Sequence, residues 1–287
     1  MSGEATSEVV GYSNPWVSRA SGLIAWLFAL VFVFPVFWMV LTSFKTEDDA
    51  QSEKPNFVFD ASFDRYREVT EELPGTLTFF TALGNSLWIV LLSTAIVLVL
   101  AIPAAYSLAI RPVEKWRDVL FFFISTKFLP IAAAVLPLYY FADFFGLIDT
   151  RTVLVILYTA MNLPLAVWMM RSFFSEVPRE LIEASQIDGA SLFGQLRSVV
   201  LPIVSPGIAA TALLCFIFAW NEYFLAVNMT VFDSQTMPIW VTTNVNNRGL
   251  FFAKLSAAST LACIPVVAAG WMAQKKLVRG LAMGAIK

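Results

Sequence analysis

The sequence predicts an all-α integral membrane protein, on two observations of composition and one of pattern. Of its 287 residues, 58% are apolar and only 14% are charged, and the mean hydropathy is +0.72. Soluble domains average about 45–50% apolar and about 25% charged residues. The charged residues also leave six long stretches almost free of charge. The solvent around most of this chain is therefore predicted to be lipid.

The six charge-poor stretches are predicted to be six transmembrane helices of one domain. A helix needs roughly 20 apolar residues to cross the hydrocarbon core. The predicted spans are 20–44, 77–110, 119–142, 152–172, 203–232 and 253–275, with a loop at 176–200 between the fourth and fifth spans and a tail at 276–287. The first stretch is longer than a signal-peptide core of about 7–15 residues, and we expect it to be a retained anchor.

The distribution of basic residues predicts which side the termini face. An even number of spans puts both termini on one side, and Lys and Arg are enriched in short cytoplasmic loops. Of the 19 Lys and Arg residues, eleven fall in loops on the side of the termini and seven in loops on the opposite side. The opposite side also carries an acidic loop at 45–76. Both termini are therefore predicted to be cytoplasmic.

The chain lacks residues that several classes of protein need for their function. The chain has no histidine, which excludes a His general base and a His-ligated zinc or haem. A formal net charge of −2 offers no basic surface for nucleic acid. Cys215 and Cys263 lie in apolar runs and are predicted to be small buried side chains. No catalytic residue and no metal site are predicted, and no GxxxxGK[ST] phosphate-binding motif occurs.

The loop at 176–200 is patterned as two short helices that meet at a corner. Pro178 suits the first turn of a helix, and Glu180 and Glu183 follow near its positive end. Asp188-Gly189 is a turn signal, after which a helical pattern resumes. The apolar side of the first helix is predicted to consist of Leu181, Ala184 and Ile187. Such a corner, tied to the fifth span, can transmit the push of a partner protein; an interfacial anchoring helix would show the same spacing.

This loop resembles the EAA loop of the permeases of ATP-binding-cassette (ABC) importers, whose pattern is roughly EAAxxDGAxxxxxFxxIxLPxxxP. The positions in register are Glu183, Ala184, Ser185, Asp188, Gly189, Ala190, Leu201, Pro202 and Pro206. Ser185 stands where the family has a second Ala, and Val199 where Ile is usual. The resemblance implies that residues Glu183 to Ala190 form a coupling helix that docks in a cleft of the ATPase subunit. Glu183 would supply a polar contact there, and Gly189 a close backbone approach.

Two further segments resemble the carbohydrate-importer permeases of the maltose-transporter type. One is the WNE segment at Trp220, Asn221 and Glu222, and the other is the tail at 278–287, which resembles the closing VRGLTAGAVK of that family. The similarity covers most of the chain and matches the smaller permease of such pairs, in a branch that carries polyols and sugar glycosides. It implies that Arg279, Gly280 and Gly284 contact the ATPase subunits.

Polar residues within the spans are the candidates for the substrate path, because charges at membrane depth usually face a cavity or a partner. Lys127 lies about 14 Å along a helix from Asp118, where it would contact substrate or pair with a carboxylate such as Glu222. Asn221 and Glu222 would line the cavity or brace helices. Tyr139 and Asn162 are weaker candidates. In the loop at 233–249, the family resemblance assigns Asn244, Asn246 and Asn247 to contacts with a binding protein or substrate; a solvated turn would have the same composition.

Together these features predict the permease subunit of an ATP-driven importer of a sugar, polyol or sugar derivative in the inner membrane of a bacterial cell. The resemblance implies three protein partners, namely a second permease, an ATPase dimer and an extracytoplasmic solute-binding protein, and it places ATP and Mg on the ATPase rather than on this chain. The alternative is an ion-coupled secondary transporter. That class needs intramembrane acids for coupling, and only Glu222 qualifies.

Overall fold

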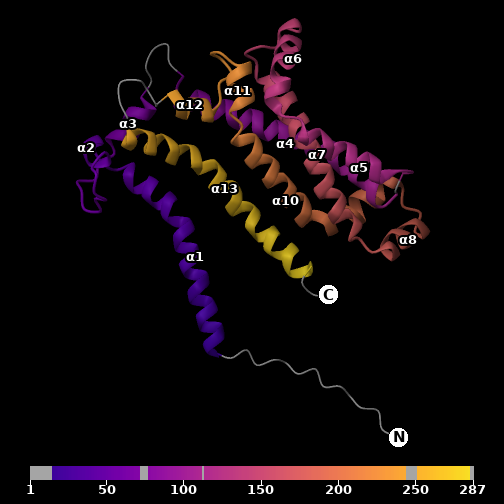
Figure 1. Ribbon diagram of the computed structural model, residues 1–287. Coiled ribbons are helices and arrows are strands. Elements are labelled where there is room, and N and C mark those ends of the chain that lie inside the picture. The colour runs from indigo at the N-terminus through magenta and orange to yellow at the C-terminus, as the bar shows by residue number, and fades with distance from the viewer. Residues whose placement is uncertain (1–14, 72–76, 112, 244–250, 285–287) are drawn as a thin grey trace.

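The computed structural model describes residues 15–71, 77–111, 113–243 and 251–284, and within these residues all regular structure is helical (Figure 1). The helices are α1 (Pro15–Thr42), α2 (Glu47–Ala50), α3 (Asp64–Thr70), α4 (Phe79–Ala109), α5 (Trp116–Ser125), α6 (Ile131–Phe144), α7 (Arg151–Ser175), α8 (Arg179–Ile187), α9 (Leu192–Gln195), α10 (Leu201–Trp220), α11 (Phe224–Met229), α12 (Met237–Thr243) and α13 (Phe252–Gly284). A 3-10 turn (Thr126–Phe128) follows α5, and a π-helical turn (Leu196–Val200) joins α9 to α10.

In the described chain five helical segments are long and apolar enough to cross a membrane: those of α1, α4, α7 and α13, and the segment from α9 to α10. The shorter α5 and α6 make a sixth crossing if they count as one bent span. The predicted all-helical membrane fold is therefore confirmed. The bundle has two ends (Figure 1). We call them the α8 end, where α4 and α7 finish, and the α12 end, where α4, α7 and α13 begin and where α2, α3 and α11 also lie.

The centre of the fold is the packing of α4 against α7. On α7 a stripe with four-residue spacing is buried, consisting of Leu154, Tyr158, Asn162, Ala166, Met170 and Phe174. On α4 the buried face carries many small residues, namely Ala82, Ser86, Ser93, Ala101 and Ala105. Small side chains let helix backbones approach closely, which is how helices associate where lipid removes the hydrophobic driving force.

A glycine marks the close contact between α10 and α7. A Cβ added at Gly207 would lie 2.2 Å from the Cγ atom of Phe173 and 2.5 Å from another atom of the same ring. Gly207→Ala is therefore expected to force the two helices apart and to lower the free energy of unfolding by about 1–3 kcal/mol. Thermal unfolding of the purified chain in detergent measures this effect. Gly84→Ala on α4 is the control, since in the described part of the chain nothing lies within 4 Å of its added Cβ. An unchanged melting temperature for Gly207→Ala would contradict the packing.

The predicted third span, 119–142, is not one continuous helix. The helical segments on either side of Leu129 and Pro130 meet at 90°. The residue before a proline is pushed out of the α region by the proline ring, and Leu129 is extended, with ψ of 121°. The break places Lys127 in the 3-10 turn that ends the first half. The predicted fifth span, 203–232, is also interrupted, because α10 ends at Trp220.

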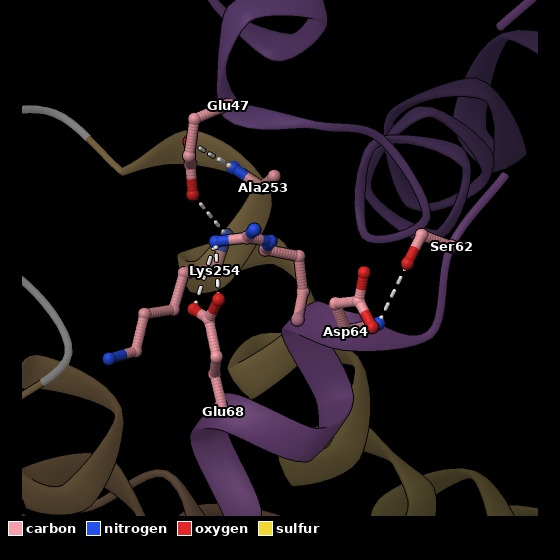
Figure 2. A network of polar contacts seen from close by, with 7 residues as sticks. Glu47, Ser62, Asp64, Glu68, Ala253 and Lys254 are labelled. Carbon is pink, nitrogen blue, oxygen red and sulfur yellow. Dashed lines mark hydrogen bonds and ion pairs between the residues drawn. The ribbon is translucent and has the colours of Figure 1, made fainter. Parts of the chain in front are cut away.

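At the α12 end, the segment after α1 is tied to the start of α13 (Figure 2). The Glu47 carboxylate accepts hydrogen bonds from the backbone N–H groups of Ala253, at 3.1 Å, and Lys254, at 2.9 Å. These N–H groups belong to the first turn of α13, which has no intrahelical partners for them. Nearby, Arg65 and Glu68 form an ion pair at 2.8 Å within α3. The acidic loop therefore has a structural role at this end, in addition to any contact with a partner.

The first helix stands apart from the rest of the bundle (Figure 1). Residues 19–37 are all exposed. The end of α1 packs against α13, where Trp38, Met39 and Thr42 lie beside Phe252 and Ser256. A helix that is apolar all round and unburied within its own chain must be covered by lipid or by another subunit.

The expectation of two buried cysteines holds for Cys215 but is wrong for Cys263, whose side chain is exposed on α13.

Candidate coupling and transport sites

The predicted corner between two short helices is formed by α8, Gly189 and α9. Gly189 has φ of +76°, a conformation that glycine adopts without the steric cost of a Cβ atom. The Ala190 N–H donates to the Ser185 carbonyl at 3.0 Å across this turn. The Ser191 hydroxyl then accepts from the Gly194 N–H and caps α9. The segment α9 continues through the π-helical turn into α10, so the corner is directly connected to a helix long and apolar enough to cross a membrane.

The side of α8 that the chain buries is not the apolar side that the sequence pattern predicts. The buried side chains of α8 are Ile182 and Ser185. The predicted apolar side faces outward instead, with Leu181 44% and Ile187 86% exposed, and Glu183 is exposed as well. An apolar surface of this kind, next to a carboxylate and a glycine corner, is typical of a surface that binds another protein. Of the residues assigned to coupling, Glu183, Ala184, Asp188, Gly189 and Ala190 are all exposed.

Ser185 is the exception, because its hydroxyl points into the chain. It donates to the Ile182 carbonyl at 2.7 Å and accepts from the Gln195 side-chain amide, also at 2.7 Å. The Gln195 carbonyl oxygen in turn accepts from the Tyr106 hydroxyl of α4. This buried polar chain joins α4, α8 and α9. Gln195 and Tyr106 were not predicted from the sequence, although a glutamine on the apolar side of the second helix is a signal that could have drawn attention.

Lys127 lines a cavity of about 570 Å³ beside the break between α5 and α6. The remaining lining is mostly apolar and includes Leu138, Met161, Pro164 and Leu225. The Lys127 ammonium donates to the Met161 carbonyl at 2.8 Å, close to the point where Pro164 interrupts the hydrogen bonding of α7. No ion pair joins Lys127 to Glu222 among the described residues. One of three N–H donors is therefore used, and the others are available to a molecule in the cavity.

The WNE segment forms the end of α10 and the start of α11. The Glu222 carboxylate accepts from the backbone N–H of Leu225 at 2.9 Å and of Ala226 at 3.2 Å, so it caps α11. The Trp220 indole N–H donates to the Ala262 carbonyl of α13 at 3.1 Å. Asn221 is exposed, and its amide donates to the Ile217 carbonyl. In this chain Trp220 and Glu222 brace helices, which is the more frequent role of polar groups in membranes.

The other candidates of the substrate path do not share the cavity of Lys127. Asn162 is 1% exposed, and its amide donates to the Cys215 carbonyl at 3.5 Å between α7 and α10. Tyr139 is on α6, where its ring contacts Tyr140.

The residues predicted to contact the ATPase through the tail, Arg279, Gly280 and Gly284, lie in the last turns of α13. Asn244, Asn246 and Asn247 lie outside the described residues.

Asp149, between α6 and α7, forms a second polar centre at the α12 end that sequence reasoning missed. Its carboxylate accepts hydrogen bonds at 2.9–3.2 Å from four consecutive backbone N–H groups, those of residues 231–234. Its backbone N–H donates to the Met229 carbonyl. Partial burial would raise the pKa of the Asp149 carboxyl, but the four N–H donors outweigh it and hold the pKa below the ordinary aspartate value. We call this arrangement the Asp149 clamp.

The clamp fixes the base of the segment that leads to α12. From α4, the Asn85 amide donates to the carbonyls of Asp233 and Gln235, each at 2.9 Å. The Ser86 hydroxyl accepts from the Met237 N–H at 2.7 Å. The segment between α11 and α12 is thus held from two sides, by Asp149 and by α4. It includes the start of the predicted contact loop at 233–249, and α12 (Met237–Thr243) separates it from Asn244.

The helical bundle, the exposed corner and the Lys127 cavity define a membrane protein with several candidate spans and an exposed helical corner at its α8 end. The chain matches the family of binding-protein-dependent transport system inner membrane components over residues 98–278. It belongs to this family and is a multi-pass membrane permease, as the EAA-like loop predicted.

Individual relatives support the same assignment. The chain is 33% identical to the diacetylchitobiose uptake system permease protein DasC of Streptomyces coelicolor, over 89% of this chain and 92% of that one. It is 32% identical to the trehalose/maltose transport system permease protein MalG of Thermococcus litoralis, over 91% and 94%. Its fold is similar to a chain in the crystal structure of a bacterial ABC transporter that imports the acidic polysaccharide alginate, with a TM-score of 0.73, 21% identity and coverage of 94% and 99%.

Proposed function

We propose that this chain is the permease subunit of an ABC importer that carries a sugar, polyol or sugar derivative into the cell. It would form the translocation path with a second permease, receive substrate from an extracytoplasmic binding protein, and be driven by a partner ATPase dimer that binds ATP and Mg. The observation that carries the proposal is the exposed α8–Gly189 corner, which is continuous with a membrane helix. The relatives named for diacetylchitobiose and for trehalose and maltose support the substrate class.

The orientation is part of the proposal, with the α8 end and both termini in the cytoplasm. ATP binding closes the ATPase pair, the corner at Glu183–Ser191 moves with it, and α10 moves as a rigid continuation of α9. Hydrolysis then reverses the motion. The exposed apolar surface of α1 would meet lipid and the second permease. This chain would supply no catalytic group, so the chemical step and the membrane gate lie in separate subunits.

Uptake into vesicles tests this function. The complete importer, with ATP enclosed on the side of the α8 end, is expected to accumulate a radiolabelled sugar delivered with its binding protein, and to stop when ATP is replaced by a non-hydrolysable analogue. Accumulation driven by a proton or sodium gradient without the ATPase would instead support a secondary transporter, as would unchanged uptake in the absence of nucleotide.

We propose further that Lys127 contacts the substrate from the cavity at the break of the third span. Lys127→Met keeps a long unbranched side chain, one atom shorter, but removes its N–H donors. The KM for uptake is expected to rise about tenfold, the loss of one hydrogen bond from a charged donor. Lys127→Arg keeps the charge and should recover part of the affinity. An unchanged KM in Lys127→Met would show that Lys127 does not contact the substrate and serves only as a hydrogen-bond donor to the Met161 carbonyl.

A further inference from the structure

A polar cavity lies at the α8 end, between one side of α8 and the ends of α4 and α7. Its volume is about 510 Å³, and its lining includes Ala109 and Ile110 after α4, and Arg171, Phe174 and Ser175 at the end of α7. From α8 it is lined by Arg179, Ile182, Glu183 and Gln186. We call it the Arg171 cavity. It shares Glu183 with the candidate docking surface but does not include Leu181 and Ile187, which are exposed elsewhere on α8.

Arg171 is held in place by an aromatic ring and is left with unused donors. Its guanidinium carbon lies 3.8 Å from the centre of the Trp116 ring, at the start of α5. Its Nε atom is buried and has no hydrogen-bond partner among the residues that the structure describes. Stacking on an aromatic face uses the flat side of a guanidinium and leaves the N–H groups at its edge free. A buried donor without a partner costs free energy, so an acceptor that reached this guanidinium would be stabilising.

The charge around the cavity is not balanced within the described chain. Arg179, Glu183 and Gln186 follow at spacings of four and three residues, so they share one side of α8. Two guanidinium groups thus face one carboxylate. In the part of the chain that the structure describes, neither Arg171 nor Arg179 has a carboxylate oxygen within 4.0 Å. The cavity is therefore suited to an anion.

The chemistry of the donors points to a phosphate. The guanidinium fork matches the oxygens of a phosphate with two parallel hydrogen bonds, and the cavity is large enough for an ester group beside it. The cavity also lies where membrane helices end, and basic pockets between such helices bind phosphate head groups on the cytoplasmic side. We propose that the Arg171 cavity binds a phosphate group, carried by an anionic lipid or by a soluble phosphorylated compound. A phosphate bound there joins α7, through Arg171, to α8, through Arg179.

Binding can be measured without any transport assay, so its failure is separate from a failure of the proposed function. The purified full-length chain in detergent is titrated with phosphatidylglycerol, with phosphatidylcholine and with inorganic phosphate, and the bound species are counted by native mass spectrometry. Arg171→Gln is expected to bind the phosphate-bearing probe about tenfold to a hundredfold more weakly than the unchanged chain, because charge-assisted hydrogen bonds are lost. Arg179→Gln, on the exposed surface of α8, is expected to weaken binding in the same direction.

Arg197→Gln is the matched control. Arg197 is an exposed arginine at the same end of the bundle and does not line the cavity, so its loss should leave binding unchanged. Preference for phosphatidylglycerol that excess inorganic phosphate does not displace would identify a lipid, and displacement by inorganic phosphate would identify a soluble ligand. Equal binding of both probes by Arg171→Gln, Arg179→Gln and the unchanged chain would overturn the proposal. So would binding that Arg197→Gln weakens to the same extent.

Discussion

Gly189→Trp is expected to abolish ATP-driven uptake while the chain still folds and inserts. Gly189 has φ of +76°, and no atom of the described residues lies within 4 Å of a Cβ added there. A side chain at this position therefore costs only about 1–2 kcal/mol of backbone strain. A partner that binds the corner closely, however, would meet the whole indole. Co-purification of the ATPase should be lost, and uptake should fall by at least about a hundredfold, equivalent to ~2.7 kcal/mol.

Gly146 offers a matched control on the other side of the bundle. It also has a positive φ, of +64°, and it also has open space around an added Cβ. It lies between α6 and α7, at the α12 end. Gly146→Trp therefore carries the same backbone strain, and the ATPase should co-purify with it as with the unchanged chain. If Gly189→Trp retained the ATPase, or if both variants lost it, the corner would not be the ATPase contact.

The helical spans could be predicted because lipid imposes a simple requirement on the sequence, a long run without charge. The break of the third span was also encoded locally, since Leu129-Pro130 disfavours a continuous helix. A charge-poor run, however, does not distinguish one straight helix from two bent halves. The helix end at Trp220 has no such local signal. It depends on Glu222, which caps α11, and on the Trp220 contact with α13.

Apolar periodicity correctly identified α8 but not the face that the chain buries. Leu181, Ala184 and Ile187 do lie on one side, yet that side is exposed, whereas Ile182 and Ser185 are buried. A surface that binds a partner can be as apolar as one that packs inside the chain, so a single sequence cannot separate the two. Contacts between segments far apart in the chain could not be predicted from the sequence either. Glu47 bonds to α13 across 206 residues, and Asp149 bonds to residues 231–234 across more than 80.

The Asp149 clamp gives the second large expected effect. Asp149→Ala removes the shared acceptor of four backbone N–H groups, and the segment at 231–234 is expected to open far more often. Hydrogen bonds to a charged acceptor are worth about 1.5–3 kcal/mol each, but water takes up part of the loss at this half-exposed site. We therefore expect amide exchange at 231–234 to become about a hundredfold faster, or ~2.7 kcal/mol, as measured by hydrogen–deuterium exchange and mass spectrometry.

Asp143→Ala is the control, since Asp143 is an exposed aspartate on α6 at the same end. Its removal should leave exchange at 231–234 unchanged. Asp149→Asn keeps the shape and one carbonyl acceptor but no charge, so its exchange should fall between Asp149→Ala and the unchanged chain. Equal exchange in all four proteins would show that the two supports from α4, Asn85 and Ser86, are sufficient to hold the segment without Asp149.

The pH dependence of the clamp follows from the lowered pKa of Asp149. Because the carboxyl has a lower pKa folded than unfolded, ionised Asp149 stabilises the folded chain at every pH above the ordinary aspartate pKa of about 3.9. That stabilisation is lost as the pH falls through the lowered folded value. The difference in melting temperature between the unchanged chain and Asp149→Asn should therefore be constant near neutral pH and disappear only in strong acid. A difference that already vanished around neutral pH would require another titrating group and would contradict a carboxylate held by four amides.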